Sequence, residues 1–166
     1  MEISLIAAAS LNDVIGKDND IPWDMPRDMK LFVEITKGHH ILSGRKNYMS
    51  IPDKYRPLSN RVNLVVTRDT SFADEGAHVF HTIKEAVDFA EKAGEEELMI
   101  IGGGEIYKQC LEFADNIYLS RIQTEIEGDT YFPSVNEDNW MLLDAEYFDK
   151  DENNPFDFSF EHYVRR

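Results

Sequence analysis

The 166-residue sequence predicts one α/β domain, covering residues 1–166, with a mixed, mostly parallel, twisted central sheet. About four helices are expected to flank the sheet, and a C-terminal antiparallel hairpin is expected to complete it. The prediction rests first on short apolar runs that end in glycine or polar residues, which are typical of strands buried on both faces of a parallel sheet. These runs span residues 3–9, 39–44, 62–67 and 97–102. It rests second on the alternation of apolar and polar residues after residue 115, which is typical of antiparallel strands.

Helical patterns lie between the apolar runs. In residues 82–94, Thr82 and Glu85 match a capping box, and Gly94 marks the end of the helix. The apolar stripe of this helix consists of Ile83, Ala86, Val87 and Ala90. Residues 104–114 form a second pattern. A third helix is expected to begin at Pro26, because the first helical position does not need the backbone N–H group that proline lacks.

One acidic residue conflicts with this third helix. Leu31, Phe32 and Ile35 form its apolar stripe, and Asp28 falls on the same side. Burying an unpaired carboxylate costs several kcal/mol or raises the pKa of the group. Asp28 is therefore either a helix-start residue favoured by the helix dipole or a functional group with a partner still to be identified.

The chain is strongly acidic, with a net charge of −15 from 32 acidic and 17 basic residues. A negative field of this size disfavours nucleic acid and anionic membrane surfaces as partners. An anionic ligand would therefore need a local cluster of cations. The acidity fits two interpretations, solubility and adaptation to high salt.

Cysteine usage indicates the compartment. The single cysteine, Cys110, allows no internal disulfide and fits a reducing environment, so we expect a cytoplasmic protein. The apolar N-terminal segment is interrupted by Asn12 and Asp13 and lacks a basic region, so it fits neither a membrane span nor a signal peptide. The five histidines show no metal-ligand spacing, and no metal site is expected.

Three of the predicted strand ends carry residues suited to binding anions. They are SGRKNY (43–48), VVTRDT (65–70) and IIGGGEIY (100–107). Ligands of open α/β sheets bind beyond the carboxyl ends of the strands, where helix N-termini offer free N–H groups. Each signal alone is weak, and the three glycines do not match the dinucleotide fingerprint. Together they predict a site for a dinucleotide that carries an additional phosphate.

Seven segments, in this order, extend the pattern along the chain. They are SLIAAAS with VIG (4–16), IPWDMPRDMKLF (21–32), SGRKNYMSI (43–51), RPLSNRVNLVVTR (56–68), IIGGGEIY (100–107), YLSRI (118–122) and EGDTYFP (127–133). Together they resemble dihydrofolate reductases over essentially the whole length. The resemblance implies a dihydrofolate reductase-like fold and NADPH-dependent reduction of 7,8-dihydrofolate to tetrahydrofolate. It also implies dihydrofolate and antifolate inhibitors as ligands, and we expect a monomer.

The resemblance assigns Asp28 to the substrate pocket. There it would hydrogen-bond the pterin and favour a proton on N5, next to the carbon that accepts the hydride. Trp23 matches a residue that orders water at this position. Ser120 stands where a Thr commonly bonds the carboxylate and the pterin. Ile21 replaces a frequent Met or Leu in the active-site loop. The other substrate-binding residues implied are Ile6, Ala7, Ala8, Met29, Phe32, Ile51, Leu58, Arg61, Ile101 and Tyr107. Arg61 would pair with the α-carboxylate of the glutamate tail.

The resemblance also assigns the cofactor site. Arg45, Thr67 and Arg68 would hold the 2′-phosphate of NADPH. The other cofactor-binding residues implied are Ala8, Ile15, Gly16, Gly44, Lys46, Asn47, Ile101, Gly103, Gly104, Glu105, Ile106 and Tyr107. Asn47 departs from the usual Thr or Ser. Pro155 replaces a Ser that holds the active-site loop in a closed-off state in some members, so we expect the loop over residues 10–24 to lack that state.

Two other functions compete with this interpretation. One is the reductase of riboflavin synthesis, which uses the same cofactor cradle on a sugar phosphate. The other is a nucleotide-binding module without catalytic activity. The inward Asp28 beside Trp23, together with Arg61, favours a pterin. An inactive relative would be expected to lose Asp28 or a cofactor arginine, and the sequence keeps them.

Overall fold

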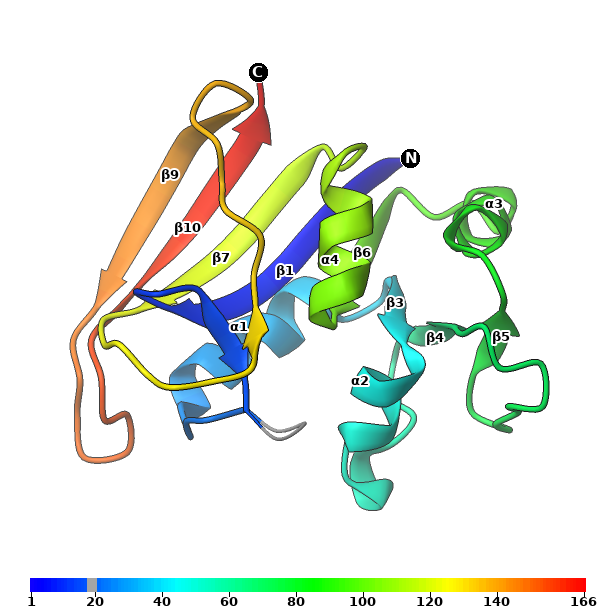
Figure 1. Cartoon of the computed structure of the whole chain (residues 1–166), viewed down its shortest axis with the longest axis horizontal. Helices are drawn as coiled ribbons and strands as arrows, with labels where there is room; N and C mark the ends of the chain where they lie inside the picture. Colours follow the sequence, from blue (N-terminus) through cyan, green and yellow to red (C-terminus); the bar gives the residue numbers. More distant parts are fainter. Residues whose placement is uncertain (18–20) are drawn as a thin grey trace.

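The structure is a computed structural model that describes residues 1–17 and 21–166 (Figure 1). The strands of its main sheet are β1 (Glu2–Ser10), β3 (His40–Gly44), β4 (Val62–Val66), β5 (His78–Phe80), β6 (Glu97–Gly102), β7 (Asn116–Ile122), β9 (Trp140–Phe148) and β10 (Phe158–Arg165). The short strands β2 (Val14–Gly16) and β8 (Thr130–Tyr131) form a separate ribbon. The helices are α1 (Pro26–Thr36), α2 (Arg45–Ser50), α3 (Ile83–Lys92) and α4 (Gly104–Leu111), with a 3₁₀ turn at Asp53–Tyr55.

The main sheet is mixed, as predicted, with strand order β5-β4-β3-β6-β1-β7-β10-β9. All neighbours from β5 to β7 pair in parallel, and β10 pairs antiparallel with both β7 and β9. The prediction that the antiparallel region begins after residue 115 is confirmed on one side of β7, which is antiparallel to β10, but it missed the parallel pairing of β7 with β1 on the other side. The physical reason is its position: β7 lies inside the sheet, and most of its residues are buried.

The helices begin where the sequence predicts them. Pro26 is the first residue of α1, and the Thr82 hydroxyl accepts a hydrogen bond from the backbone N–H of Glu85 at 3.1 Å, which caps α3. Gly94 follows α3 with a φ of 85°, a left-handed conformation that suits glycine. The pattern predicted to run to residue 114 ends earlier, because α4 stops at Leu111 and a turn continues to Ala114. None of the helices in the described ranges is long and apolar enough to cross a membrane.

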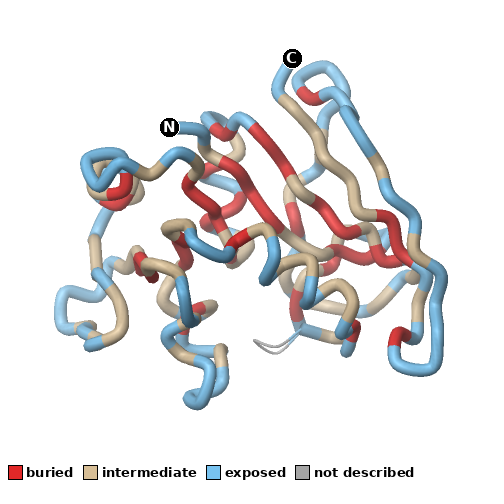
Figure 2. The backbone as a smooth tube through the Cα atoms, turned by 180° about the vertical axis from the view of Figure 1, so that it is seen from behind, coloured by how far each residue is buried: buried red, intermediate tan, exposed pale blue. Residues whose placement is uncertain are grey.

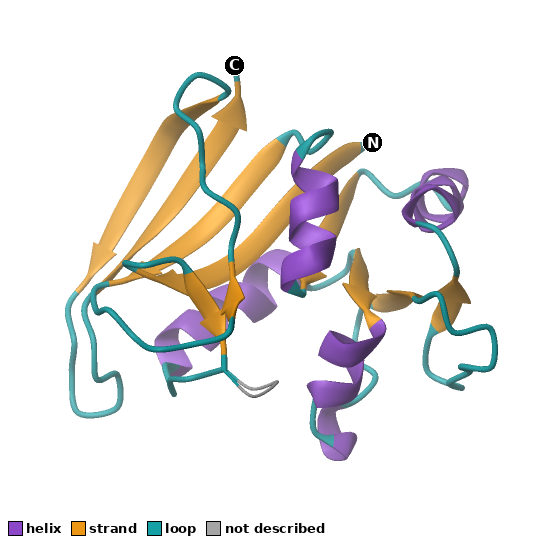
Figure 3. Ribbon diagram, in the orientation of Figure 1, coloured by secondary structure: helices purple, strands orange, loops and turns teal. Residues whose placement is uncertain are grey.

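The central strands supply the core, where the buried residues concentrate (Figure 2). Leu5, Leu42 and Ile100 come from neighbouring parallel strands and have no exposed surface. Cys110 reaches the same core from α4, and burial raises the pKa of its thiol to about 12. The parallel pairing brings the carboxyl ends of β1, β3, β4 and β6 to one edge of the sheet, where α2 and α4 begin (Figure 3).

At the opposite, amino-terminal edge of the sheet, one carboxylate binds residues of two strands. We call this set, made of Glu95, His39 and His40, the clamp. Glu95 precedes β6, and its side chain is only 7% exposed. Its oxygens bind Nδ1 of His39 at 2.9 Å and Nδ1 of His40 at 2.8 Å, and they accept the backbone N–H of His40. Burial opposes ionisation of Glu95, but these hydrogen bonds outweigh it and lower the pKa to about 2. The clamp thus joins the start of β3 to the start of β6.

The clamp predicts a pH-dependent contribution to stability. Because the pKa of Glu95 lies below its ordinary value of about 4.3, the carboxylate stabilises the fold above that pH and loses this effect as pH falls toward 2. Glu95→Gln should lower the free energy of unfolding by about 2 to 3 kcal/mol at pH 7. Urea titrations at pH 7, 5 and 4 measure this difference, which should narrow as the pH falls.

The neighbouring residue provides a matched control. Glu96 is exposed, and Glu96→Gln removes the same charge without touching the histidines. This variant should unfold at nearly the wild-type urea concentration. A Glu95→Gln protein as stable as Glu96→Gln at pH 7 would contradict the role of the clamp.

Candidate active site

The acidic residue on the apolar face of α1 has a partner. Asp28 is half-buried, and the hydroxyl of Ser120 on β7 donates to its Oδ1 at 2.5 Å. Burial raises the pKa of Asp28 to about 6, although the Ser120 hydrogen bond acts in the opposite direction by stabilising the charged form. The carboxyl group is therefore poised to be ionised or protonated near neutral pH. A carboxyl group whose pKa burial shifts toward neutral pH is a candidate for proton chemistry.

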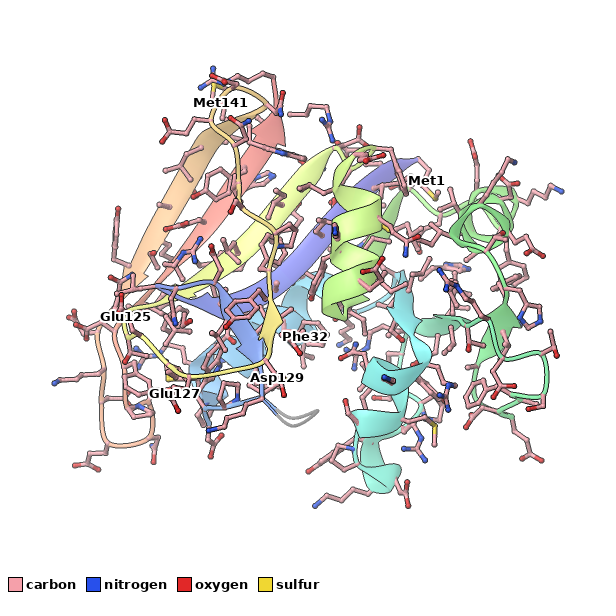
Figure 4. The ribbon with its side chains drawn as sticks, in the orientation of Figure 1. Met1, Phe32, Glu125, Glu127, Asp129 and Met141 are labelled. Carbon is pink, nitrogen blue, oxygen red and sulfur yellow. The ribbon has the colours of Figure 1, made fainter. Side chains whose placement is uncertain are left out.

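Apolar and aromatic groups from three elements surround this carboxyl group. Ile6 on β1 is 4% exposed, and its carbonyl accepts a hydrogen bond from the Tyr107 hydroxyl at 2.6 Å. Burial and the charge of Asp28 both raise the pKa of Tyr107, so its hydroxyl stays protonated. Phe32 projects from α1 one turn beyond Asp28 (Figure 4). The site therefore joins one acid to a wall that suits a flat, partly apolar ligand.

A cation is fixed at the other end of α1. Arg61 donates through Nε to the carbonyl of Ser59 at 2.9 Å and through a guanidinium nitrogen to the Thr36 hydroxyl at 3.0 Å. Its guanidinium carbon lies 6.0 Å from the centre of the Phe32 ring. Burial lowers the pKa of Arg61, which means that the charge is partly desolvated. An anionic partner would offset that cost, so Arg61 is a candidate for binding a carboxylate.

The three segments predicted to bind anions meet at the carboxyl edge of the sheet. Gly44 precedes α2, whose first residues are Arg45 and Lys46, while Thr67 and Arg68 follow the neighbouring strand β4. The Asn47 side chain links this group to β6 by donating to the carbonyl of Ile101 at 3.3 Å, which gives the unusual residue a structural contact.

The glycine run at the end of β6 combines tight packing with an open side. A Cβ atom on Gly102 would meet the Tyr107 ring at 3.1 Å, and one on Gly104 would meet Thr130 at 2.9 Å. A Cβ on Gly103 would meet no atom within 4 Å. The backbone is thus close-packed on either side of one position that faces free space. This is a cradle that a pyrophosphate can approach.

The part of this edge around Arg45 contains charges of both signs. The charges of Arg45 and His81 contribute to a lowered pKa at Asp69, after the larger effect of two hydrogen bonds from Ser71. Nδ1 of His81 lies 2.8 Å from the carbonyl oxygen of Thr67. Arg45 therefore lies among the residues that follow β4 and β5, as a phosphate site built from successive strand ends requires.

The β2–β8 ribbon closes the opposite side of the glycine run. Glu125, Glu127 and Asp129 lie along the loop that leads to β8 (Figure 4), and the N–H of Asp129 donates to the carbonyl of Gly16 at 3.1 Å. A Cβ atom on Gly104 would lie 4.0 Å from the Ile15 side chain. Ile15 and Gly16 are thereby held beside the start of α4.

The predicted residues fall into groups by position. The strand-end and helix-start residues Ala8, Gly44, Arg45, Lys46, Asn47, Thr67, Arg68, Ile101, Gly103, Gly104 and Glu105 lie along the same edge of the sheet. Ile51 and Leu58 follow α2, and Ala7 lies on β1. Ile106 and Tyr107 are mostly buried core residues. Met29 and Ile21 are 50% and 52% exposed.

The active-site loop is described in part. Residues 18–20 lie outside the described ranges, so the expected behaviour of the loop over residues 10–24 stays a prediction. On the described side, Trp23 packs against the small apolar cluster that contains Met25 and Phe158.

Two contacts of the site were not predicted from the sequence. Thr36 is fully buried and binds Arg61, and Asn154 binds the backbone of Arg27 at the start of α1. Thr36 lies two helical turns after Asp28 on the same stripe, and a polar residue there was the available signal. Asn154 gave no such signal, because its partner is distant in sequence.

Comparison with known proteins identifies the family. The family model described as dihydrofolate reductase matches residues 2–165. The chain belongs to the dihydrofolate reductase family. It is similar to the dihydrofolate reductase of Bacillus subtilis, with 42% identity over 99% of this chain and 95% of the relative, and to that of Haemophilus influenzae, with 44% identity over 96% of each.

A solved dihydrofolate reductase has the same fold. The enzyme from Enterococcus faecalis, complexed with NADP(H) and RAB-propyl, aligns with a TM-score of 0.92 and 31% identity, covering 99% of this chain and 96% of that one. The predicted dihydrofolate reductase-like fold is therefore confirmed, and so is the resemblance found in the sequence.

The buried acid should reduce the stability of the protein at neutral pH. Because burial raises the pKa of Asp28 to about 6, the folded chain holds this proton more tightly than the unfolded chain does. Its contribution to stability is complete below about pH 4 and is lost as pH rises through 6. Asp28→Asn should therefore raise the free energy of unfolding at pH 8 by about 1 to 2 kcal/mol, a range reduced for partial solvent exposure.

Thermal melts between pH 4.5 and 8 provide the measurement. The melting temperature of Asp28→Asn should exceed that of wild type by an amount that grows with rising pH. Asp24→Asn, at a nearby exposed acid, should melt at the wild-type temperature throughout. A difference in melting temperature that stays constant over the whole pH range would mean that ionisation of Asp28 does not cause it.

Proposed function

We propose that this site transfers a hydride from NADPH to C6 of 7,8-dihydrofolate, giving 5,6,7,8-tetrahydrofolate, with Asp28 as the residue that supports protonation. The observation that carries the proposal is the Asp28 carboxyl group, held by Ser120 on an apolar helix face with a pKa of about 6. A hydride acceptor in a ring becomes more reactive when the neighbouring nitrogen carries a proton. Membership of the dihydrofolate reductase family supports the same reaction.

Asp28 has a second oxygen for the substrate. Ser120 takes Oδ1, and we assign Oδ2 to the amino group and ring nitrogen of the pterin. The carboxylate then favours a proton on the pterin, through water ordered beside Trp23 rather than by direct transfer to N5. Ile21, from the loop segment before Trp23, would help to exclude bulk water, and exclusion of water strengthens the effect of the charge.

The remaining substrate contacts are assigned from the resemblance to the family. The pterin and aminobenzoyl groups would lie against Ile6, Ala7, Ala8, Met29, Phe32, Ile51, Leu58, Ile101 and Tyr107. The glutamate tail would place its α-carboxylate on Arg61, whose guanidinium group Thr36 and Ser59 already orient. Preorganisation of this cation reduces the entropy lost on binding.

The residues at the strand edge fit NADPH. Arg45, Thr67 and Arg68 would hold the 2′-phosphate. Lys46 and the backbone of the glycine run would hold the pyrophosphate, since Gly103 faces open space. Glu105 would act through its backbone, because its side chain accepts a hydrogen bond from Gln109 at 3.2 Å along the helix. The other assigned contacts are Ala8, Ile15, Gly16, Gly44, Asn47, Ile101, Gly104, Ile106 and Tyr107. When bound, NADPH supplies the hydride.

The proposal extends to ligands, assembly and location. Antifolate inhibitors are expected to occupy the substrate site, and the chain is proposed to act as a monomer in the cytoplasm, without nucleic-acid or membrane partners. The net charge of −15 and the single, buried cysteine support these assignments.

Replacing Asp28 tests the proposed chemistry. Wild-type protein should consume NADPH, followed by its absorbance, only when dihydrofolate is present. Asp28→Asn keeps the size but removes the charge, and it should slow hydride transfer by on the order of 10² to 10⁴ at pH 7. Activity should recover in part at acidic pH, where solvent protonates the substrate, while NADPH affinity stays nearly unchanged. A variant as fast as wild type at pH 7, or one defective only in NADPH binding, would refute the assignment.

Replacing Arg45 tests the cofactor assignment. Arg45→Ala should weaken NADPH binding on the order of 10- to 100-fold, since a charge-assisted contact contributes about 1.5 to 3 kcal/mol. NADH binding should change little, because NADH has no 2′-phosphate. Titration of each cofactor into the protein gives both dissociation constants, and Lys92→Ala, at the exposed end of α3, serves as the charge-matched control. Equal losses for the two cofactors would place the 2′-phosphate elsewhere.

A further inference from the structure

We propose that Asn154, in the loop between β9 and β10, is a positioning residue for Asp28, because it binds the backbone of the first turn of α1 and fixes where that helix begins. This inference rests on the proposed function of Asp28. Asn154 lies 127 residues away from Arg27, whose N–H group donates to the Asn154 Oδ1 at 2.9 Å. Arg27 is the residue that directly precedes Asp28.

The start of α1 lacks a local cap. Met25 stands at the N-cap position and makes no side-chain hydrogen bond there, and Pro26 has no N–H group. The N–H of Arg27 is therefore the first donor of the helix without an intrahelical acceptor. A side-chain oxygen from a neighbouring residue usually satisfies such a donor. In this protein a distant loop supplies that oxygen.

The capping oxygen cannot turn away freely. Asn154 is 5% exposed, and its Nδ2 donates to the Asp151 Oδ1 at 2.9 Å. The same Asp151 oxygen also accepts the backbone N–H groups of Asn153 and Asn154, at 2.9 and 2.8 Å. Because these bonds hold the amide nitrogen, they also hold Oδ1 toward α1.

The loop also binds the side chain of Arg27. The guanidinium group binds the Asp151 Oδ2 at 2.5 Å and the carbonyl of Asp149 at 3.1 Å, and it lies 5.8 Å from the centre of the Phe148 ring. Both the backbone and the side chain of Arg27 are thus bound to the loop between β9 and β10. We call this set, made of Arg27, Asp149, Asp151 and Asn154, the hairpin clasp.

The hairpin clasp connects to the partner of Asp28 through the sheet. The loop joins β9 to β10, and β10 pairs antiparallel with β7, where Phe160 lies opposite Ser120. Phe148 and Phe158, at the ends of these strands, pack with Met25 in a small apolar cluster. The clasp therefore holds the start of α1 in register with the strand that carries Ser120. Misplacing a reacting group by about 1 Å can cost on the order of 100-fold in rate.

Charged and titratable groups face Asp28 from the other elements too. Ser120 comes from β7 and Tyr107 from α4, and Tyr107 is the group whose ionisation the Asp28 charge opposes. Neither belongs to the clasp. A change at Asn154 would therefore reach Asp28 through the position of α1 and not through a new direct contact.

Asn154→Ala tests the inference with two readouts. The first needs no activity: the Asp28 carboxyl group is titrated by ¹³C NMR, and its midpoint should move from about 6 toward the ordinary value as the helix start loosens and admits water. The second is the single-turnover rate of hydride transfer with dihydrofolate, which should fall about 10-fold or more while NADPH affinity is unchanged. Absence of turnover in the wild type would refute the proposed function alone, because the titration still decides the clasp.

Three further variants separate positioning from general destabilisation. Asn153→Ala changes an exposed neighbour in the same loop, and Glu95→Gln destabilises the fold at the opposite edge of the sheet, so both should keep the wild-type midpoint and rate. Asn154→Asp keeps an oxygen acceptor for Arg27 but replaces the Nδ2 donor to Asp151 with a second carboxylate oxygen, so its rate should fall between those of wild type and Asn154→Ala. It also provides a folded test case if Asn154→Ala does not fold.

The inference is overturned by any of three results. The first is an Asn154→Ala protein with the wild-type Asp28 midpoint and hydride-transfer rate. The second is a Glu95→Gln protein that loses rate to the same extent as Asn154→Ala. The third is an Asn154→Asp protein whose hydride-transfer rate is as low as that of Asn154→Ala.

Discussion

Parallel pairing of β3, β4, β6, β1 and β7 is the constraint on which the rest of the structure depends. Parallel strands need long connections that cross over the sheet, and these connections become helices that bury both of its faces. The same direction brings every carboxyl end to one edge, so short segments distant in sequence meet there. The strand-end cations and the glycine run therefore lie along one edge, and Ser120 of β7 binds Asp28 of α1.

This constraint also explains which parts of the fold could be predicted. Runs buried on both faces, such as the one that became β6, are apolar throughout, so they indicate parallel strands directly. The parallel pairing of β7 with β1 was missed because the polar residues of β7 resemble those of an antiparallel strand, although its neighbours bury most of it. The three-residue strands β2 and β5 and the two-residue strand β8 were not predicted, since so few residues carry no periodicity.

The candidate site divides in the same way. Asp28 could be predicted because a charge on an apolar stripe conflicts with its surroundings, and such conflicts often mark function. Arg61 looks like an ordinary surface charge, and only the resemblance to a family gave it a role. Thr36 and Asn154 were missed for a further reason. Their importance lies in which segments meet in space, and neither local propensity nor charge patterning contains that information.

The buried thiol of Cys110 makes the protein a convenient object for chemical labelling. It is the only cysteine, it has no exposed surface, and burial raises its pKa to about 12, so almost no thiolate exists near neutral pH. A thiol reagent would therefore react with the native chain only when α4 leaves the core. The same property means that a cysteine introduced at the surface would carry a fluorophore or spin label alone, without prior removal of the natural residue.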